Sequence, residues 1–264
     1  MNFKNKVLWI TGASSGIGEA LAYEASRQGA KLILSSRNIT ALEKVKNACA
    51  YKENVHVLPL DLADYKNFDT LTAKAIAFFG TIDVLVNNGG ISQRSFVKET
   101  SITVDERIMQ INYLGTVALT KALLPHFVKN KRGQFVVTTS IVGKIGTPLR
   151  SSYAASKHAL HGFFDSLRAE HYNDNIKVTL VCPGFVATKV SINALTGDGT
   201  KQNTMDKATA KGIQPDVFAQ KMLKTIVSEK QEVYIGGTKE VFAVYLKRFL
   251  PKLLARVIRK LAVT

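Results

Sequence analysis

The order of apolar runs and helical patterns along the chain constrains its fold more than any other feature. Seven short apolar runs, typical of buried strands, alternate with segments of helical periodicity. The runs cover residues 6–10, 31–35, 55–60, 82–86, 134–138, 177–182 and 232–235. Repeated strand–helix alternation predicts parallel strands, with the intervening helices packed on both faces of the sheet. Since no linker or second core interrupts the 264 residues, we expect one doubly wound α/β domain with a seven-stranded parallel sheet.

The helical segments fill the gaps between these strands. We expect helices over 19–27, 39–50, 65–79, 153–172 and 216–229, with one or two more inside 103–128.

A glycine-rich turn follows the first strand and opens the first helix. It reads Thr11-Gly12-Ala13-Ser14-Ser15-Gly16-Ile17-Gly18. Strand, glycine turn and helix form the context of a phosphate-binding turn, because glycine lets the backbone approach a pyrophosphate and the helix N-terminus supplies N–H groups. The residues predicted to bind a dinucleotide here are Thr11, Gly12, Ser14, Ser15, Gly16, Ile17 and Gly18.

The tip of the second strand carries Arg37 in place of the acidic residue that holds the ribose hydroxyls in NAD sites. A guanidinium suits a 2′-phosphate, which a carboxylate would repel. Ser14 and Ser15 add hydroxyl donors nearby. We therefore predict NADP(H) over NAD(H); the alternative is that Arg37 is an ordinary surface arginine.

Polar residues also follow the third and fourth strands. Asp61 either hydrogen-bonds the adenine or caps the following turn. Asn87-Asn88-Gly89-Gly90 indicates a tight turn, which at the carboxyl edge of a parallel sheet faces the ligand crevice.

Tyr153 and Lys157 lie four residues apart in a predicted helix and share one face. A nearby ammonium favours the phenolate, so we expect Lys157 to lower the pKa of Tyr153 and make it a general acid/base. By itself the pair could equally be an exposed helix pair.

Taken together, these motifs resemble those of the short-chain dehydrogenase/reductase (SDR) family over nearly the whole chain. The motifs are Thr11-Gly12-x-x-x-Gly16-x-Gly18, Asn87-Asn88-x-Gly90, Asn112, Ser140, Tyr153-x-x-x-Lys157 and Pro183-Gly184 followed by Thr188. The family usually has alanine where Gly89 stands, and that difference should be mild. The stretch from Asn87 to Ser95, residues 193–199 and the basic tail resemble the subgroup called members 7 and 7B.

The resemblance implies a single Rossmann-fold domain and assigns roles. Tyr153 would donate a proton to a carbonyl, Lys157 would hold the nicotinamide ribose, Ser140 would orient the substrate oxygen, and Asn112 would hold a relay water. It also implies a lipophilic carbonyl substrate and a homo-oligomer. Further cofactor contacts are expected at Leu62, Asn88, Gly89, Pro183, Gly184, Val186 and Thr188.

The net charge and the cysteine and histidine content limit the kinds of partner that we expect this protein to bind. A net charge of +16 makes anionic partners plausible, but no nucleic-acid motif is present and we expect none to bind. The two cysteines, Cys49 and Cys182, fit a reducing compartment. Neither the cysteines nor the five histidines show metal-ligand spacing, so we expect no metal.

Two regions stand apart from the catalytic core. Residues 189–212 are polar and glycine-containing, and we expect a mobile lid, with disorder as the alternative. Residues 241–264 carry apolar residues at helical spacing from Phe242 to Leu261, with Lys and Arg between them and Pro251 breaking the helix. This basic amphipathic extension, beyond a catalytic domain of residues 1–240, either binds an anionic bilayer surface or packs on protein.

We therefore expect an NADPH-dependent reductase that converts a lipophilic ketone or aldehyde to an alcohol. The alternatives are an NAD-dependent alcohol dehydrogenase working oxidatively, a non-catalytic NADPH sensor and a membrane-surface scaffold. The amino terminus runs into Val7-Leu8-Trp9-Ile10, too short for a signal sequence, so we expect a cytoplasmic protein, with peripheral membrane attachment left open by the tail.

Overall fold

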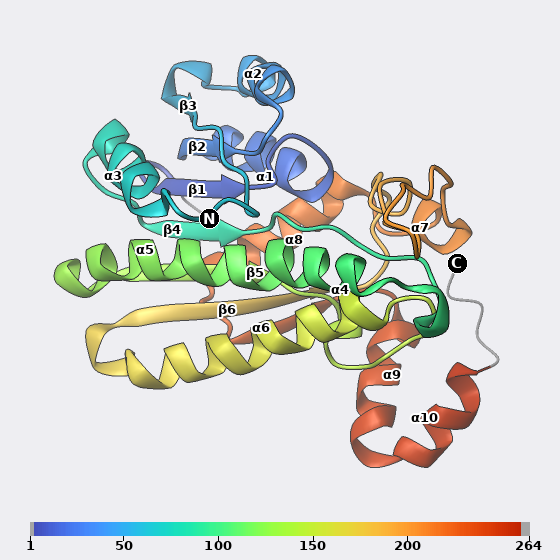
Figure 1. Cartoon of the computed structure of the whole chain (residues 1–264). Helices are drawn as coiled ribbons and strands as arrows, with labels where there is room; N and C mark the ends of the chain where they lie inside the picture. Colours follow the sequence, from blue (N-terminus) through green and yellow to red (C-terminus); the bar gives the residue numbers. More distant parts are fainter. Residues whose placement is uncertain (1–2, 260–264) are drawn as a thin grey trace.

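Seven strands form one parallel sheet in the computed structural model, which describes residues 3–259 (Figure 1). Their bounds are β1 Val7–Thr11, β2 Lys31–Ser35, β3 Val55–Val57, β4 Val84–Asn87, β5 Gly133–Thr138, β6 Ile176–Pro183 and β7 Glu232–Ile235. The order across the sheet is β3-β2-β1-β4-β5-β6-β7, and every pairing is parallel. The predicted doubly wound sheet is confirmed.

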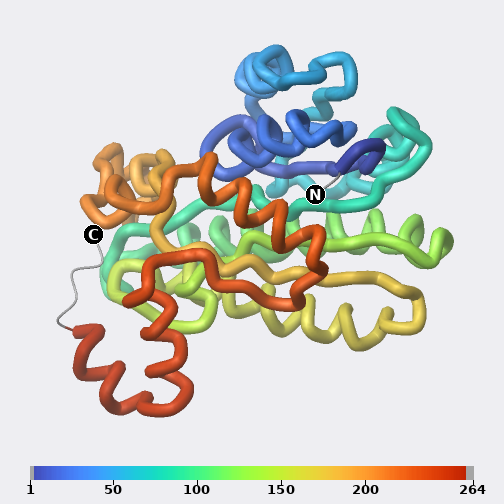
Figure 2. Tube along the Cα trace, turned by 180° about the vertical axis from the view of Figure 1, so that it is seen from behind, coloured from blue at the N-terminus to red at the C-terminus, as the bar shows by residue number. Residues whose placement is uncertain are grey.

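Helices cover both faces of this sheet (Figures 1 and 2). One face packs against α1 Gly16–Arg27, α2 Ile39–Ala48 and α8 Pro215–Val227. The other packs against α3 Phe68–Phe79, α5 Gly115–Asn130 and α6 Ser151–Glu170. The remaining helices are α4 Ile102–Met109, α7 Lys207–Ala210, α9 Thr238–Phe249 and α10 Pro251–Ile258.

Strand periodicity divides the core into two apolar layers. In β1, Leu8 and Ile10 face the α1 and α8 layer, while Val7 and Trp9 face the α5 and α6 layer. Successive strand side chains point to opposite faces, so a strand buried on both sides reads as a continuous apolar run. The indole of Trp9 donates to Ser35 Oγ at 2.9 Å, which satisfies the polar atom of this buried side chain.

The third strand ends earlier than predicted, at Val57 instead of residue 60. Pro59 has no N–H and cannot continue the ladder. Leu58 and Leu60 still donate backbone hydrogen bonds to Leu34 and Ser36, so the extension beside β2 continues to the cleft.

A π-helical turn, Gln110–Leu114, joins α4 to α5 and makes one long helix of the predicted segment 103–128. The wider turn contains Asn112, which is fully buried. Such turns are rare and concentrate at functional sites.

The carboxyl-terminal segment forms a helical hairpin that projects from the body beside the carboxyl edge of the sheet (Figures 1 and 2). Pro251 is the first residue of α10, so the predicted break into two helices is confirmed. Leu261, which we expected on the apolar side of this tail, lies outside the described residues. Among residues 3–259, no helix combines the length and hydropathy needed to span a bilayer.

Two helical glycines give a paired test of how closely the helices pack against the rest of the fold. A Cβ at Gly115 would lie 2.0 Å from the backbone oxygen of Leu62, whereas one at Gly162 in α6 would meet nothing within 4 Å. Gly115→Ala should lower the free energy of unfolding by about 1–3 kcal/mol. Gly162→Ala should raise it by roughly 0.5–1 kcal/mol, because alanine loses less backbone entropy in a helix. Urea denaturation measures both, and equal effects would contradict the close contact at Gly115.

Candidate active site

A cleft opens at the carboxyl edge of the sheet, where the strand order reverses. The chain passes from β1 to α1 on one face and from β4 to α5 on the other, so the turns after these adjacent strands separate and leave a crevice. Its volume is about 1390 Å³. Every predicted site residue except Gly18 and Asn112 lines it, and those two lie directly behind its wall.

The turns after β1 and β4 are joined by hydrogen bonds. Thr11 Oγ1 accepts from the backbone N–H groups of Asn88 and Gly89, both at 3.0 Å. The Asn88 amide donates to the backbone oxygen of Thr11 at 3.1 Å. This contact needs glycine, because a Cβ at Gly12 would lie 2.8 Å from Gly89 Cα and one at Gly18 would lie 2.4 Å from the Gly12 oxygen. Gly12 also has a φ of +65°.

This cradle fits a dinucleotide phosphate. The backbone approaches closely with no side chain in the way, and α1 begins at Gly16, where its free N–H groups face the cleft.

Arg37 stands exposed at the far end of the cleft, just after β2. Asp61 lines the same cleft and accepts a hydrogen bond from Ala63 N at 2.9 Å. Asp61 therefore caps the turn that follows it, as one of the two roles considered from the sequence, and it also lines the cleft.

The predicted catalytic residues meet at the opposite end of the cleft. Ser140 follows β5, and its hydroxyl hydrogen-bonds the phenol of Tyr153 near the start of α6. One turn later, Lys157 Nζ lies 5.8 Å from the Tyr153 ring centroid and donates to the backbone oxygen of Thr138 at 2.8 Å.

The pKa of Tyr153 differs from the sequence-based expectation. Burial raises it above its ordinary value, and the Ser140 hydrogen bond and the charges of Arg94 and Arg150 oppose that rise without cancelling it. Lys157 is not among the groups that act appreciably on it. Burial also lowers the pKa of Lys157, to about 8, because the ammonium is desolvated beside the sheet. The expected net lowering of the Tyr153 pKa by Lys157 is therefore wrong for this arrangement.

Asn112 supports the site from behind. Its amide donates to Ile91 O at 2.9 Å and to Ser156 Oγ at 3.0 Å, and its oxygen accepts from Ile91 N at 2.8 Å. Gly90 separates it from the lysine, since a Cβ there would lie 3.0 Å from Asn112 Oδ1 and 3.6 Å from Lys157 Nζ. Asn112 therefore ties the π-helical turn to the loop after β4 and to α6.

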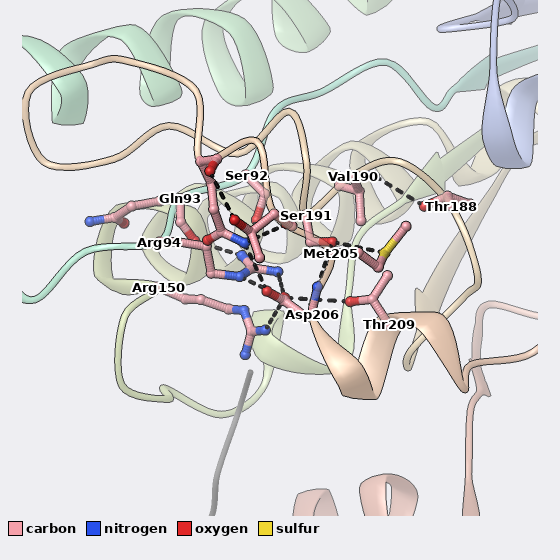
Figure 3. A network of polar contacts seen from close by, with 12 residues as sticks. Ser92, Gln93, Arg94, Arg150, Thr188, Val190, Ser191, Met205, Asp206 and Thr209 are labelled. Carbon is pink, nitrogen blue, oxygen red and sulfur yellow. Dashed lines mark hydrogen bonds and ion pairs between the residues drawn. The ribbon is translucent and has the colours of Figure 1, made fainter.

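A buried charge cluster joins Arg94, Arg150 and Asp206 (Figure 3). Asp206 Oδ2 accepts from Arg94 Nη2 at 2.7 Å and from Arg150 Nη2 at 3.4 Å. The three side chains are at most 5% exposed. Gln202 donates to the Asp206 carboxylate at 3.0 Å, and the backbone N–H of Asp206 donates to Ser191 Oγ at 3.2 Å. Because Asp206 belongs to residues 189–212, the cluster attaches this segment to the loop after β4, which carries Arg94, and to Arg150 directly before α6.

Two guanidinium groups pair with the Asp206 carboxylate in this cluster. Burial alone would raise the pKa of Asp206, but hydrogen bonds from Arg94 and Gln202 hold it below its ordinary value. Burial, with the charge of Arg94, lowers the pKa of Arg150 to about 10, which leaves it protonated at neutral pH. The positive charges of Arg94 and Arg150 act on the phenol of Tyr153 and oppose the rise of its pKa.

A second cluster, outside the cleft, joins His161, Cys182 and Glu232, whose donor atoms lie within 4.8 Å of one another. Glu232 already pairs with Lys144 at 2.7 Å and accepts from the Tyr234 hydroxyl. Burial raises the pKa of Cys182 to about 12, so the sulfur is a thiol at neutral pH and a poor ligand. The donor set does not favour a metal.

Comparison with known proteins identifies the family. The family described as short chain dehydrogenase matches residues 6–199. The chain belongs to the short-chain dehydrogenase/reductase family. A fruit-fly (Drosophila melanogaster) relative named dehydrogenase/reductase SDR family protein 7-like is 42% identical, over 98% of this chain and 81% of its own. Mouse (Mus musculus) SDR family member 7B is 42% identical, over 96% and 80%.

Solved SDR structures share the fold. A Burkholderia phymatum SDR in complex with NAD has a TM-score of 0.84 at 22% identity, covering 96% of both chains. An alcohol dehydrogenase from Thermococcus sibiricus, complexed with 5-hydroxy-NADP, has a TM-score of 0.75 at 27% identity, covering 89% of this chain and 97% of its own. SDR proteins are oxidoreductases that bind a nicotinamide dinucleotide, and the subgroup resemblance to members 7 and 7B is confirmed.

The sequence did not reveal the Arg94–Asp206–Arg150 cluster. These residues lie in three separate loops with no spacing that relates them. The signals in the sequence were two arginines near the predicted site. Arg150 lies just before the predicted helix of Tyr153, and Arg94 follows Gly89-Gly90. Residues 189–212, for which disorder was the alternative, instead form a folded segment with bridges at Gln93–Leu195 and Leu195–Lys201.

Removing the carboxylate of this cluster tests its energetic weight. Asp206→Asn removes the carboxylate that pairs with two buried guanidinium groups and should lower the free energy of unfolding by about 3–5 kcal/mol at pH 7. Because the folded-state pKa of Asp206 is depressed, its stabilisation is present above the unfolded pKa and lost as pH falls through the folded value. The difference between the two proteins should therefore shrink below about pH 4.

The matched control is Asp165→Asn, which removes the carboxylate of an ion pair with Arg168 whose aspartate is 54% exposed. That change should cost less than about 1 kcal/mol. Similar losses for the two variants in urea denaturation would show that the buried cluster contributes no special stability.

Proposed function

We propose that the protein reduces a lipophilic ketone or aldehyde to an alcohol, with NADPH as the hydride donor. The observation that carries the proposal is that Ser140, Tyr153 and Lys157 line the same cleft as the glycine cradle. Lys157 Nζ lies 5.8 Å from the Tyr153 ring centroid, and the charges of Arg94 and Arg150 act on the phenol.

Each side chain has a distinct task in this proposal. NADPH, when bound, supplies the hydride. Tyr153 donates its proton to the substrate oxygen as negative charge develops there, and Ser140 holds that oxygen by a second hydrogen bond. The positive charges of Arg94 and Arg150 stabilise the tyrosinate that remains after proton transfer. Lys157, buried beside the phenol, holds the nicotinamide ribose.

The walls support an apolar substrate. Val104, Ile111, Val190 and Leu195 contribute apolar surface from α4, the π-helical turn and residues 189–212. A substrate with a long apolar portion would replace water along these side chains.

The cofactor preference rests on Arg37. It stands at the tip of β2 with no carboxylate at the neighbouring strand-end positions Ser36 and Asn38. Asn38 instead caps α2 by accepting from Ala41 N at 2.9 Å. A 2′-phosphate would therefore meet a guanidinium fork at this end of the cleft.

Two other activities use the same cleft. An NAD-dependent alcohol dehydrogenase would run the chemistry oxidatively, with Tyr153 as base; Arg37 disfavours it. A non-catalytic NADPH sensor would need the cradle but not the hydroxyl pair, so retention of Ser140, Tyr153 and Lys157 disfavours it. The homo-oligomer and the cytoplasmic location remain predictions, which gel filtration with light scattering and cell fractionation would test.

Arg37→Asp tests the cofactor assignment. Loss of a charge-assisted hydrogen bond, with a carboxylate now repelling the phosphate, should lower the NADPH-to-NADH ratio of kcat/KM by at least about 10–100-fold. Lys44→Asp, at an exposed site on neighbouring α2, gives the same charge change as a control and should leave the ratio unchanged. An unaltered ratio in Arg37→Asp would refute the role of Arg37.

Tyr153→Phe tests the chemistry. NADPH oxidation should be followed with a panel of small ketones and aldehydes, 3-oxoacyl thioesters, ketosteroids, retinal and acyl-dihydroxyacetone phosphate. Turnover should fall by about 100-fold or more, because general acid catalysis is lost, while NADPH binding persists. Tyr172→Phe, at a side chain that is 79% exposed, is the control. Tight NADPH binding without turnover on the whole panel would favour the sensor.

A further inference from the structure

The α9–α10 hairpin has one face that packs on the protein body. Leu254 is buried against Ile141 and Ile145, the residues that follow Ser140 along the chain. Ile258, one turn after Leu254, packs against the same cluster. The hairpin therefore contacts the protein body through the face that carries Leu254 and Ile258. This packing covers only part of the apolar surface of the hairpin.

A second set of apolar side chains on the hairpin faces outward. Phe249 is 74% exposed and Phe242 is 62% exposed, although both are large and apolar. The full set is Phe242, Tyr245, Phe249, Leu250, Leu253 and Val257. In each helix these residues recur every three or four positions, so they form continuous stripes beside the packed residues.

Basic side chains border these stripes. Residues 241–259 contain five exposed cations, and the same segment contains no Asp or Glu. The cations are Lys247, Arg248, Lys252, Arg256 and Arg259. Exposed apolar surface with a rim of one charge marks an interaction site, and the charge identifies the partner as anionic.

We propose that the α9–α10 hairpin is a docking surface for an anionic lipid bilayer. Exposed aromatic and aliphatic side chains enter the interface of headgroups and acyl chains, while the Lys and Arg side chains contact the anionic headgroups. A second copy of the chain fits less well. A symmetric pairing through this face would bring the same five cations of each copy together without compensating carboxylates.

The hairpin is also joined to the wall of the cleft. Glu240, in the first turn of α9, accepts from the backbone N–H of Phe185 at 3.0 Å, directly after Pro183-Gly184. Figures 1 and 2 show the hairpin at the end of the sheet that also carries α7. Docking would therefore hold the substrate end of the cleft near the bilayer. The docking surface itself does not depend on the proposed reductase activity.

Vesicle flotation of the full chain tests the proposal without using activity. The protein should float with phosphatidylcholine–phosphatidylserine vesicles and far less with phosphatidylcholine alone, and salt should weaken its binding. Lys247→Gln/Arg248→Gln/Lys252→Gln should lower the partition coefficient about fivefold per charge, on the order of 100-fold in total. Phe242→Ser/Phe249→Ser should lower it by about 10-fold or more.

Matched controls carry the same changes elsewhere on the surface. Lys44→Gln/Lys129→Gln/Lys221→Gln and Tyr51→Ser/Tyr172→Ser alter exposed residues outside the hairpin and should bind within about threefold of the unmodified protein. Absence of flotation with anionic vesicles, or equal losses in hairpin and control variants, would overturn the proposal. Self-association that Phe242→Ser/Phe249→Ser abolishes, without any lipid binding, would overturn it in favour of a second copy.

Discussion

The hydrogen bonds between the turns after β1 and β4 are the contact on which the rest of the site depends. Thr11 and Asn88 hold the two turns together at the point where the sheet reverses its strand order. The contact requires glycine at positions 12, 18 and 89, because a side chain on any of them would meet backbone or a packed neighbour. Without this contact, the glycine cradle at one end of the cleft and the tyrosine at the other would not be held at a fixed position relative to each other.

The substrate end of the cleft is held by charge as well as by the sheet. Arg94 and Arg150 come from loops after β4 and before α6, and Asp206 comes from residues 189–212. A buried ion pair is costly to desolvate and is a weak source of net stability, but it is expensive to break. The cluster therefore specifies where that segment lies, and the charges of Arg94 and Arg150 also act on the phenol of Tyr153. The same cluster therefore fixes the position of residues 189–212 and contributes to the electrostatic field at the phenol of Tyr153.

Most of the fold was predictable because both faces of the sheet are buried. Parallel strands covered on both sides read as apolar runs, and β2 and β7 have the predicted bounds. The early end of β3 at Pro59 and the π-helical turn at Asn112 were not predicted. β3 ends early because Pro59 has no N–H, whereas the π-helical turn depends on hydrogen-bond partners that are distant in sequence, such as Ile91 and Ser156 for Asn112.

The sequence alone determined which functional groups occur and in what order along the chain. These are a glycine turn, an arginine at the tip of the second strand, and then a serine, a tyrosine and a lysine. These signals are local, since each needs only its own turn or helix to be recognised. The tertiary structure decided the balance of burial and charge. It raised the pKa of Tyr153 through burial and placed Arg94 and Arg150 around Asp206. It also decided which face of the α9–α10 hairpin is packed and which is exposed. Desolvation and exposure depend on every neighbour in space, and neighbours in space cannot be derived from spacing along the chain.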